Sequence, residues 1–160
     1  MAEHRSDTLV DALAAEAYRV RAQLDVASVS ISVWEREQGL LRTLVNTGTL
    51  SPAEHERPTD EVYPVHTFPA LVTLLERRTP YCFGLGDRVD VSSASLAASL
   101  GKETQAAAPI SVRGEVWGAL WVATLPGDRP LTRSDLPRLV RAANEIARVL
   151  AAGPAHQLQG

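Results

Sequence analysis

Two mostly apolar runs separated by a short polar turn constrain the fold of this chain more than any other feature. The runs cover residues 104–112 and 115–124, and Arg113 and Gly114 lie between them. Strands joined by so short a turn pair antiparallel, because a parallel connection needs a crossover of a dozen or more residues. The sequence therefore predicts a β-hairpin and an antiparallel sheet around it.

A second hairpin is expected closer to the N-terminus. Residues 26–34 alternate in polarity, which is typical of a strand with two unlike faces. One face would carry Val29, Ile31 and Val33, and the other Ser28, Ser30, Ser32 and Trp34. The segment REQG then turns the chain into a second strand at 40–48.

Helical periodicity marks both ends of the chain. Apolar residues recur at steps of three and four over 7–24 and over 134–151. Between the hairpins we expect a long connection at 49–64, a helix from Pro69, a short strand at 81–83, a turn-rich loop at 84–90 and a short helix at 92–101. This order predicts an α+β fold with a central antiparallel sheet of five to six strands. The terminal helices would cover one face, with short helices and loops on the other.

Length and composition narrow the class of protein. At 160 residues we expect one domain, 8–151, with flexible ends at 1–7 and 152–160. The net charge of −3 and the lack of a Lys/Arg run argue against a nucleic-acid partner. No apolar run is long enough to span a membrane. A single cysteine, Cys82, and an N-terminus unlike a secretory signal favour a cytoplasmic protein.

Catalytic motifs are absent from the sequence. It contains no G-x-S-x-G, HExxH or P-loop pattern, and its acidic residues form no apolar-flanked pair suited to acid–base chemistry. The segment SLGK at 99–102 matches S-x-x-K in letters only, without the motifs that accompany it in enzymes. We therefore expect neither an enzyme activity nor a metal site.

Two single residues leave alternatives open. His66 lies between Pro64 and Pro69, which restrict the local backbone. Its imidazole could hydrogen-bond to the backbone of a packed loop, contact a ligand or, as a third possibility, ligate a haem. Cys82 lies between two aromatic residues, where a free cysteine usually serves as a small buried hydrophobe.

The alternation at 115–124 predicts which side chains share a face. Trp117, Ala119, Trp121 and Ala123 would lie on one face, and Val116, Gly118, Leu120 and Val122 on the other. Gly118 would let either a packed helix or a ligand approach the backbone closely.

With these elements in order, the chain resembles a GAF domain over about residues 8–150. The resemblance is carried by Pro109 with SVRGEVWG and ALWVA, and by the closing segment LTRSDLPRLVRAANEIARVL. Upstream, VYPVHTFPALVTLLERRTPYCF looks like the helix-and-strand segment of actinobacterial GAF domains. The resemblance implies a PAS-related fold and a sensory or regulatory module.

The same resemblance bears on cofactors. PVHTFP falls where phytochrome GAF domains carry Pro-Ala-Ser-Asp-Ile-Pro, but Thr67 occupies the aspartate position and no Cys-His pair is present for a bilin. GAF proteins that reduce methionine sulfoxide use several cysteines, and Cys82 alone cannot form an intramolecular disulfide. We expect neither bilin nor haem, and the cofactor is unknown.

The resemblance implies a small-molecule pocket between the sheet and the 60–80 segment, with a signal passed through the terminal helices. Candidate ligand-binding residues are Ser32, Trp34, Tyr63, His66, Thr67, Phe68, Leu71, Cys82 and Trp121. Since such domains often dimerise through helices at their ends, we also expect a homodimer through the N- and C-terminal helices.

An alternative function is a degenerate GAF domain that mediates only dimerisation or protein contacts. A cavity of roughly 300–1,000 Å³ beside His66 would favour ligand binding. A filled interior with a broad exposed apolar strip on the terminal helices would favour assembly.

Overall fold

The computed structural model describes residues 2–84 and 90–153, with side chains from residue 7 onward. Within these residues, six strands form one sheet in the order β3-β2-β1-β6-β5-β4, and all neighbouring strands are antiparallel. The strands are β1 Ser28–Glu35, β2 Leu40–Gly48, β3 Val62–Pro64, β4 Tyr81–Phe83, β5 Thr104–Val112 and β6 Glu115–Thr124. The α-helices are α1 Ala2–Leu24, α2 Pro69–Leu75, α3 Val91–Ser99 and α4 Leu136–Ala152, and 3₁₀ turns cover Val65–Thr67 and Arg133–Asp135.

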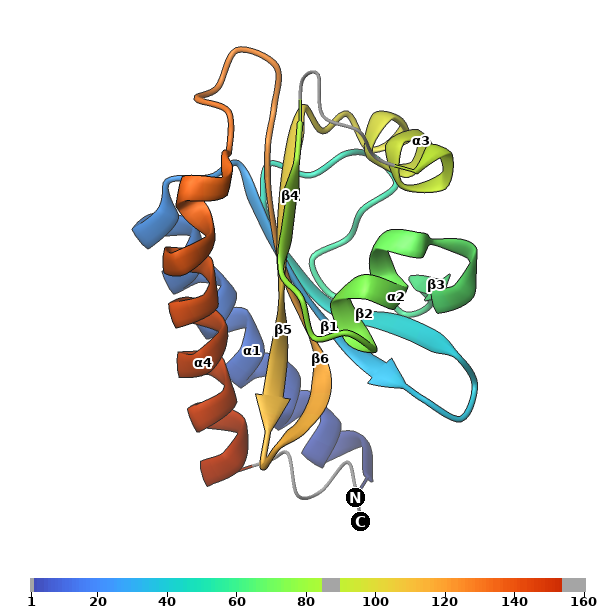
Figure 1. Ribbon diagram of the computed structural model, residues 1–160. Helices are drawn as coiled ribbons and strands as arrows, with labels where there is room; N and C mark the ends of the chain where they lie inside the picture. Colours follow the sequence, from blue (N-terminus) through green and yellow to red (C-terminus); the bar gives the residue numbers. More distant parts are fainter. Residues whose placement is uncertain (1, 85–89, 154–160) are drawn as a thin grey trace.

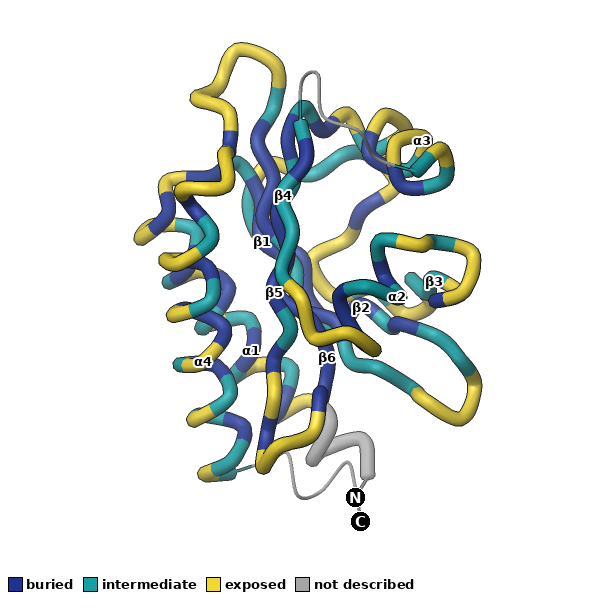
Figure 2. Tube along the Cα trace, viewed as in Figure 1, coloured by how far each residue is buried: buried dark blue, intermediate teal, exposed yellow. Residues whose placement is uncertain are grey.

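The sheet separates two layers of helices. Figure 1 shows α1 and α4 side by side on one face, and α2 and α3 on the other. Buried segments concentrate in the sheet and on the inward sides of the helices (Figure 2). The larger apolar core joins α1 and α4 to residues such as Ile31 and Leu120. The smaller core joins α2 to Leu41 and Ala119.

The structure confirms the predicted α+β layering and both hairpins. In the β5–β6 hairpin, Arg113 and Gly114 both have positive φ, 55° and 80°, as a tight turn matching the strand twist requires. The helix at Pro69 is also confirmed, with the proline in its first turn. None of the described helices combines the length and apolarity needed to cross a membrane.

Several boundaries differ from those predicted. Strand β3 and the following 3₁₀ turn were not predicted, because three residues paired with Leu40–Arg42 are too few to show a period. Helix α1 begins at Ala2, earlier than the periodicity indicated. The predicted loop at 84–90 and the predicted tail at 152–160 fall largely outside the described residues, as does residue 1.

The predicted faces of β6 are wrong at its start. Ile110 pairs with Gly118 while Ser111 pairs with Val116, so Trp117 is the extra residue of a β-bulge. The bulge turns Trp117 into the core beneath α1 and α4, and turns Val116 toward α2. Strict alternation therefore holds only beyond the bulge.

Position 118 has room only for glycine because the neighbouring strand β1 lies against it. The sequence suggested a packed helix or a ligand there instead. A Cβ placed on Gly118 would lie 1.9 Å from the carbonyl oxygen of Ser32 in β1. Because β1 and β6 are the two central strands, this contact fixes the closest approach in the middle of the sheet.

The 3₁₀ turn Arg133–Asp135, which leads into α4, begins with a reciprocal cap. The Thr132 N–H donates to Asp135 Oδ2 at 2.8 Å, and the Thr132 side chain accepts from the Asp135 backbone. Burial by itself would raise the pKa of Asp135. The hydrogen bond from Thr132 and the nearby Arg129 guanidinium outweigh burial and hold that pKa below its ordinary value.

We predict that Gly118→Ala lowers the free energy of unfolding by about 3 kcal/mol, because β1 and β6 must separate to admit the new carbon. Urea unfolding measures the loss. Gly153→Ala is the matched control, since its added Cβ would lie 3.8 Å from the Val149 carbonyl oxygen, an ordinary contact. Equal losses in the two variants would contradict the prediction.

We predict that Asp135→Asn lowers the free energy of unfolding by about 1 kcal/mol at pH 7. A carboxylate with a depressed pKa stabilises the fold above its unfolded pKa of about 3.9, and this contribution is lost as the pH falls through the folded value. The difference between wild type and variant should therefore shrink in urea unfolding at pH 3. A difference that does not change with pH would refute this account.

Candidate functional site

A cavity of about 60 Å³ lies on the sheet face that carries α2 and α3. Its walls come from all six strands, from both short helices and from the loops that precede β3 and β5. At about 10–15 Å³ for each water molecule, it holds several waters or a small ligand. It is therefore smaller than the several hundred cubic ångströms used above as the mark of a ligand pocket.

Five of the nine candidate residues line this cavity. Ser32 and Trp121 come from the central strands, Tyr63 from β3, and Phe68 and Leu71 from the start of α2. The period-two alternation of β1 explains why its serines face the cavity while Val29 and Ile31 enter the larger core.

The other four candidates lie elsewhere. In the 3₁₀ turn, Val65 packs inward, and His66 and Thr67 are exposed. The His66 side chain is 73% exposed, with Nε2 3.8 Å from Glu76 Oε1. A three-residue turn buries one side chain and directs the other two outward. The structure therefore gives His66 no backbone-bonded or cavity position.

Trp34 and Cys82 also lie outside the cavity lining. Trp34 faces α2 as predicted, but it lies at the far end of β1, where the Arg36 guanidinium carbon lies 4.2 Å from its ring centroid. Cys82 alternates with Tyr81 on β4. Tyr81 lines the cavity, so Cys82 packs against the larger core on the opposite face.

Aromatic rings form two walls of the cavity. Tyr63 and Phe68 meet edge to face with centroids 6.1 Å apart, and Tyr81 and Trp121 do the same at 6.1 Å. Among the lining residues that the structure describes, these four are the aromatic ones. Each pair presents a rigid apolar surface to the interior.

A hydrogen-bond chain crosses the cavity floor. Ser30 Oγ contacts the Asn46 side-chain oxygen at 2.5 Å, and Asn46 Nδ2 donates to Glu61 Oε1 at 2.9 Å. Tyr63 Oη donates to the other carboxylate oxygen of Glu61 at 2.7 Å. Burial and this bond to Glu61 raise the pKa of Tyr63 far above its ordinary value, so the phenol keeps its proton.

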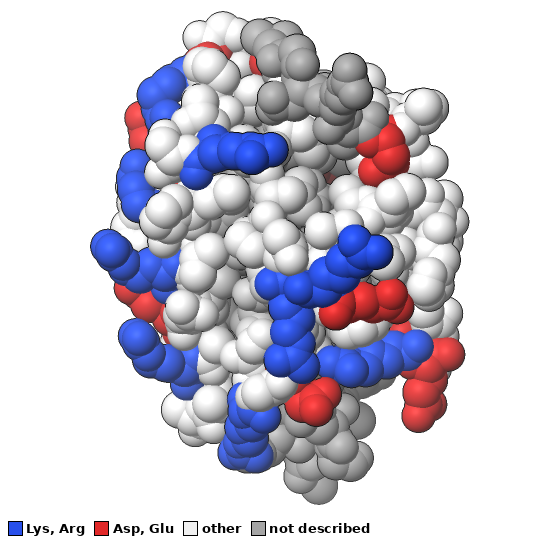
Figure 3. Space-filling view, viewed as in Figure 1, with Lys and Arg blue, Asp and Glu red and all other residues white. Residues whose placement is uncertain are grey.

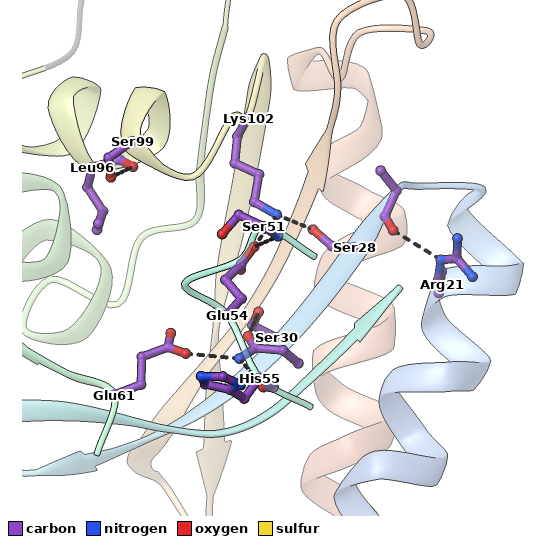
Figure 4. Close-up of polar contacts among 12 residues, drawn as sticks. Arg21, Ser28, Ser30, Ser51, Glu54, His55, Glu61, Leu96, Ser99 and Lys102 are labelled. Atoms are coloured by element: carbon purple, nitrogen blue, oxygen red, sulfur yellow. Dashed lines mark hydrogen bonds and ion pairs between the residues drawn. The ribbon is translucent and has the colours of Figure 1, made fainter. Parts of the chain in front are cut away.

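The only lysine of the chain is buried in the cavity wall. Lys102 Nζ lies 2.9 Å from Glu54 Oε1 and donates to Ser28 Oγ at 3.0 Å (Figure 4). The two charged side chains are 2% and 4% exposed. Since the other 15 basic residues are arginines, the one lysine is placed where a compact ammonium fits between two oxygen atoms.

Sequence reasoning missed the charged part of this site. Glu54 lies in the long connection predicted at 49–64, and its carboxylate accepts a hydrogen bond from the Ser51 N–H. Lys102 was set aside as the chance end of SLGK. The one signal that could have singled it out is its being the sole lysine. Glu61 and Tyr81 carried no recognisable signal.

We predict that Lys102→Met lowers the free energy of unfolding by about 3–5 kcal/mol, because it leaves the Glu54 carboxylate buried without its partner. The double variant Lys102→Met/Glu54→Leu should recover most of this loss, since no buried charge then remains. Urea unfolding of both variants and of Glu54→Leu completes a double-mutant cycle. Additive losses would show that the two charges are not coupled.

Comparisons with known proteins agree with this architecture. A sequence model of the GAF domain family matches residues 8–150. No match was found among curated protein sequences.

Solved structures share the fold at low sequence identity. The phycocyanobilin-bound GAF domain of a cyanobacterial phytochrome has a TM-score of 0.74 and 16% identity, covering 95% of this chain and 94% of that one. Residues 122 to 287 of a methyl-accepting chemotaxis protein have a TM-score of 0.69 and 18% identity, and the match covers 95% of this chain and 96% of that one. The GAF domain of an Acinetobacter phosphoenolpyruvate-protein phosphotransferase has a TM-score of 0.66 and 16% identity, and the match covers 97% of this chain and 90% of that one. Since the family match spans nearly the whole chain, this protein belongs to the GAF domain family.

Proposed function

We propose that this protein is a non-catalytic sensory GAF domain that acts in the cytoplasm. It binds a small molecule between the sheet and the 60–80 segment and signals through α1 and α4. The observation that carries the proposal is the cavity, which combines two aromatic walls with a buried ion pair on the face away from the terminal helices. Ser32, Tyr63, Phe68, Leu71 and Trp121 contact the ligand.

A short chain of contacts connects the cavity to α1. Lys102 donates to Ser28, the first residue of β1. The preceding residue, Ala27, accepts a hydrogen bond through its carbonyl oxygen from Arg21 Nε of α1 at 3.1 Å (Figure 4). A ligand that binds better to one arrangement of these contacts shifts the position of α1, because only differential affinity moves such an equilibrium.

The outer faces of α1 and α4 suit a homodimer. Exposed acidic residues, Asp7 and Asp11, lie on α1, where Asp11 also pairs with Arg57 at 2.6 Å, whereas Arg138, Arg141 and Arg148 are exposed on α4. Figure 3 shows basic side chains along the side of the molecule where α4 lies. A two-fold axis would place each acidic face against the partner's basic face.

The degenerate-domain alternative is favoured by the small cavity volume of about 60 Å³, but not by the surface of the terminal helices. It requires a broad apolar strip on the terminal helices, and among the described residues the exposed large hydrophobic side chains are Tyr18 and Val91. Only Tyr18 lies on a terminal helix.

We predict that native mass spectrometry of the protein purified from cells detects a dimer carrying a retained small molecule, which is lost on denaturation. Ser30→Phe fills the cavity and should abolish the retained mass without dissociating the dimer. Ser111→Phe is the matched control, because Ser111 is exposed on β5 outside the cavity. The Ser111→Phe variant should still retain the small molecule.

Two results would argue against the proposed function. A wild-type spectrum without retained mass, or equal retention in wild type and Ser30→Phe, would show that no retained molecule is bound in this cavity. A monomer at all concentrations would separately remove the dimer.

A further inference from the structure

The aromatic residues of this chain gather at the cavity. The chain has three Trp, three Tyr and two Phe, and four of these eight line the cavity as the two edge-to-face pairs. Two of the rings come from β3 and the start of α2, and the other two from β4 and β6. Four rings from separate elements that line one cavity offer aromatic surface to a bound group, here called the aromatic cage, and ring faces attract positive charge.

The charges around the cavity leave an excess of negative charge. Of the lining residues that the structure describes, Glu54 and Glu61 are acidic and Lys102 is basic, so two negative charges and one positive leave a net charge of −1. Lys102 is paired with Glu54. The excess therefore resides on Glu61.

Glu61 is held only by neutral groups. Its oxygens accept hydrogen bonds from Asn46 and Tyr63, and no basic side chain of the described residues lies within ion-pair distance of it. Glu61 thus lies in a partly buried position next to the Tyr63–Phe68 wall. In Figure 4, Lys102 lies at the top of the group beside Glu54, and Glu61 lies below it to the left.

We infer that the ligand of this cavity is a small organic cation, a quaternary or alkylated ammonium group held by the aromatic cage with Glu61 as its counter-charge. This inference rests on the proposed function and specifies its ligand class. The cation supplies the positive charge that Glu61 lacks, and its methyl groups pack against the rings. The small volume of the cavity limits the ligand to a compact group of this kind.

An anionic ligand fits the same cavity poorly. It would bring a second negative charge to Glu61, while Lys102 is already neutralised by Glu54. Desolvation strengthens this discrimination, since charges interact more strongly in a site shielded from water.

Choline, its neutral isostere 3,3-dimethylbutan-1-ol and the anion 3,3-dimethylbutanoate test the inference. The three share one shape and differ in charge. Isothermal titration calorimetry with the full chain, repeated by Trp fluorescence, should show choline binding about tenfold or more tighter than the alcohol. The anion should bind weakest.

Each other outcome overturns the inference. If the alcohol or the anion binds as tightly as choline, the ligand is not a cation, yet the cavity still binds small molecules and the proposed function stands. If none of the three binds, the cation is again excluded. The retained mass in the native spectrum then decides separately whether the cavity has any ligand.

Two variants test whether choline binds at Glu61 and at the aromatic cage. Glu61→Gln should weaken choline binding about tenfold and leave the binding of the alcohol unchanged, whereas the matched Glu76→Gln, on the surface beside His66, should change neither. Trp121→Leu should weaken choline binding, with Trp34→Leu outside the cavity as its control. Circular dichroism melting confirms that each variant is folded. Equal choline affinity in Glu61→Gln and wild type would overturn the assignment of the counter-charge.

Discussion

The two unlike faces of β1 underlie the rest of this structure. As a central strand, β1 pairs with both β2 and β6 and therefore sits in the middle of the sheet. Its valine and isoleucine side chains enter the core beneath α1 and α4, and its serines line the cavity. One strand thus supplies the packing that holds the terminal helices and the polar floor of the proposed site. Gly118 of β6 allows the β1 backbone to pass close to it at Ser32.

The polar groups of the cavity are arranged in two separate systems. Lys102, Glu54 and Ser28 form a compensated group at the start of β1, close to the contact between Ala27 and Arg21. Glu61 forms an uncompensated group with neutral partners beside the aromatic rings. In the proposed function, the first system connects the cavity to α1, and the second binds the ligand. This separation is why the proposed ligand class and the proposed route to the helices depend on different residues.

Position within an element decided which candidate residues could be found from the sequence. Ser32 and Trp121 were found because alternation on a strand assigns faces reliably where the strand is regular. Trp117 was misplaced because a β-bulge inserts one residue and reverses the alternation, and no pattern in VRGEVWG marks that insertion. His66 was misplaced because the orientation of a side chain in a single 3₁₀ turn depends on how the turn packs.

The sequence by itself determined the layered α+β architecture, the antiparallel hairpins and the amphipathic terminal helices. These features follow from local periodicity and turn chemistry, which depend on residues close together in the chain. Only the tertiary structure decided that Lys102 meets Glu54, that Glu61 has no cationic partner among the described residues, and that four aromatic rings line one cavity. Such contacts join residues tens of positions apart, and the register of the whole sheet sets their distances.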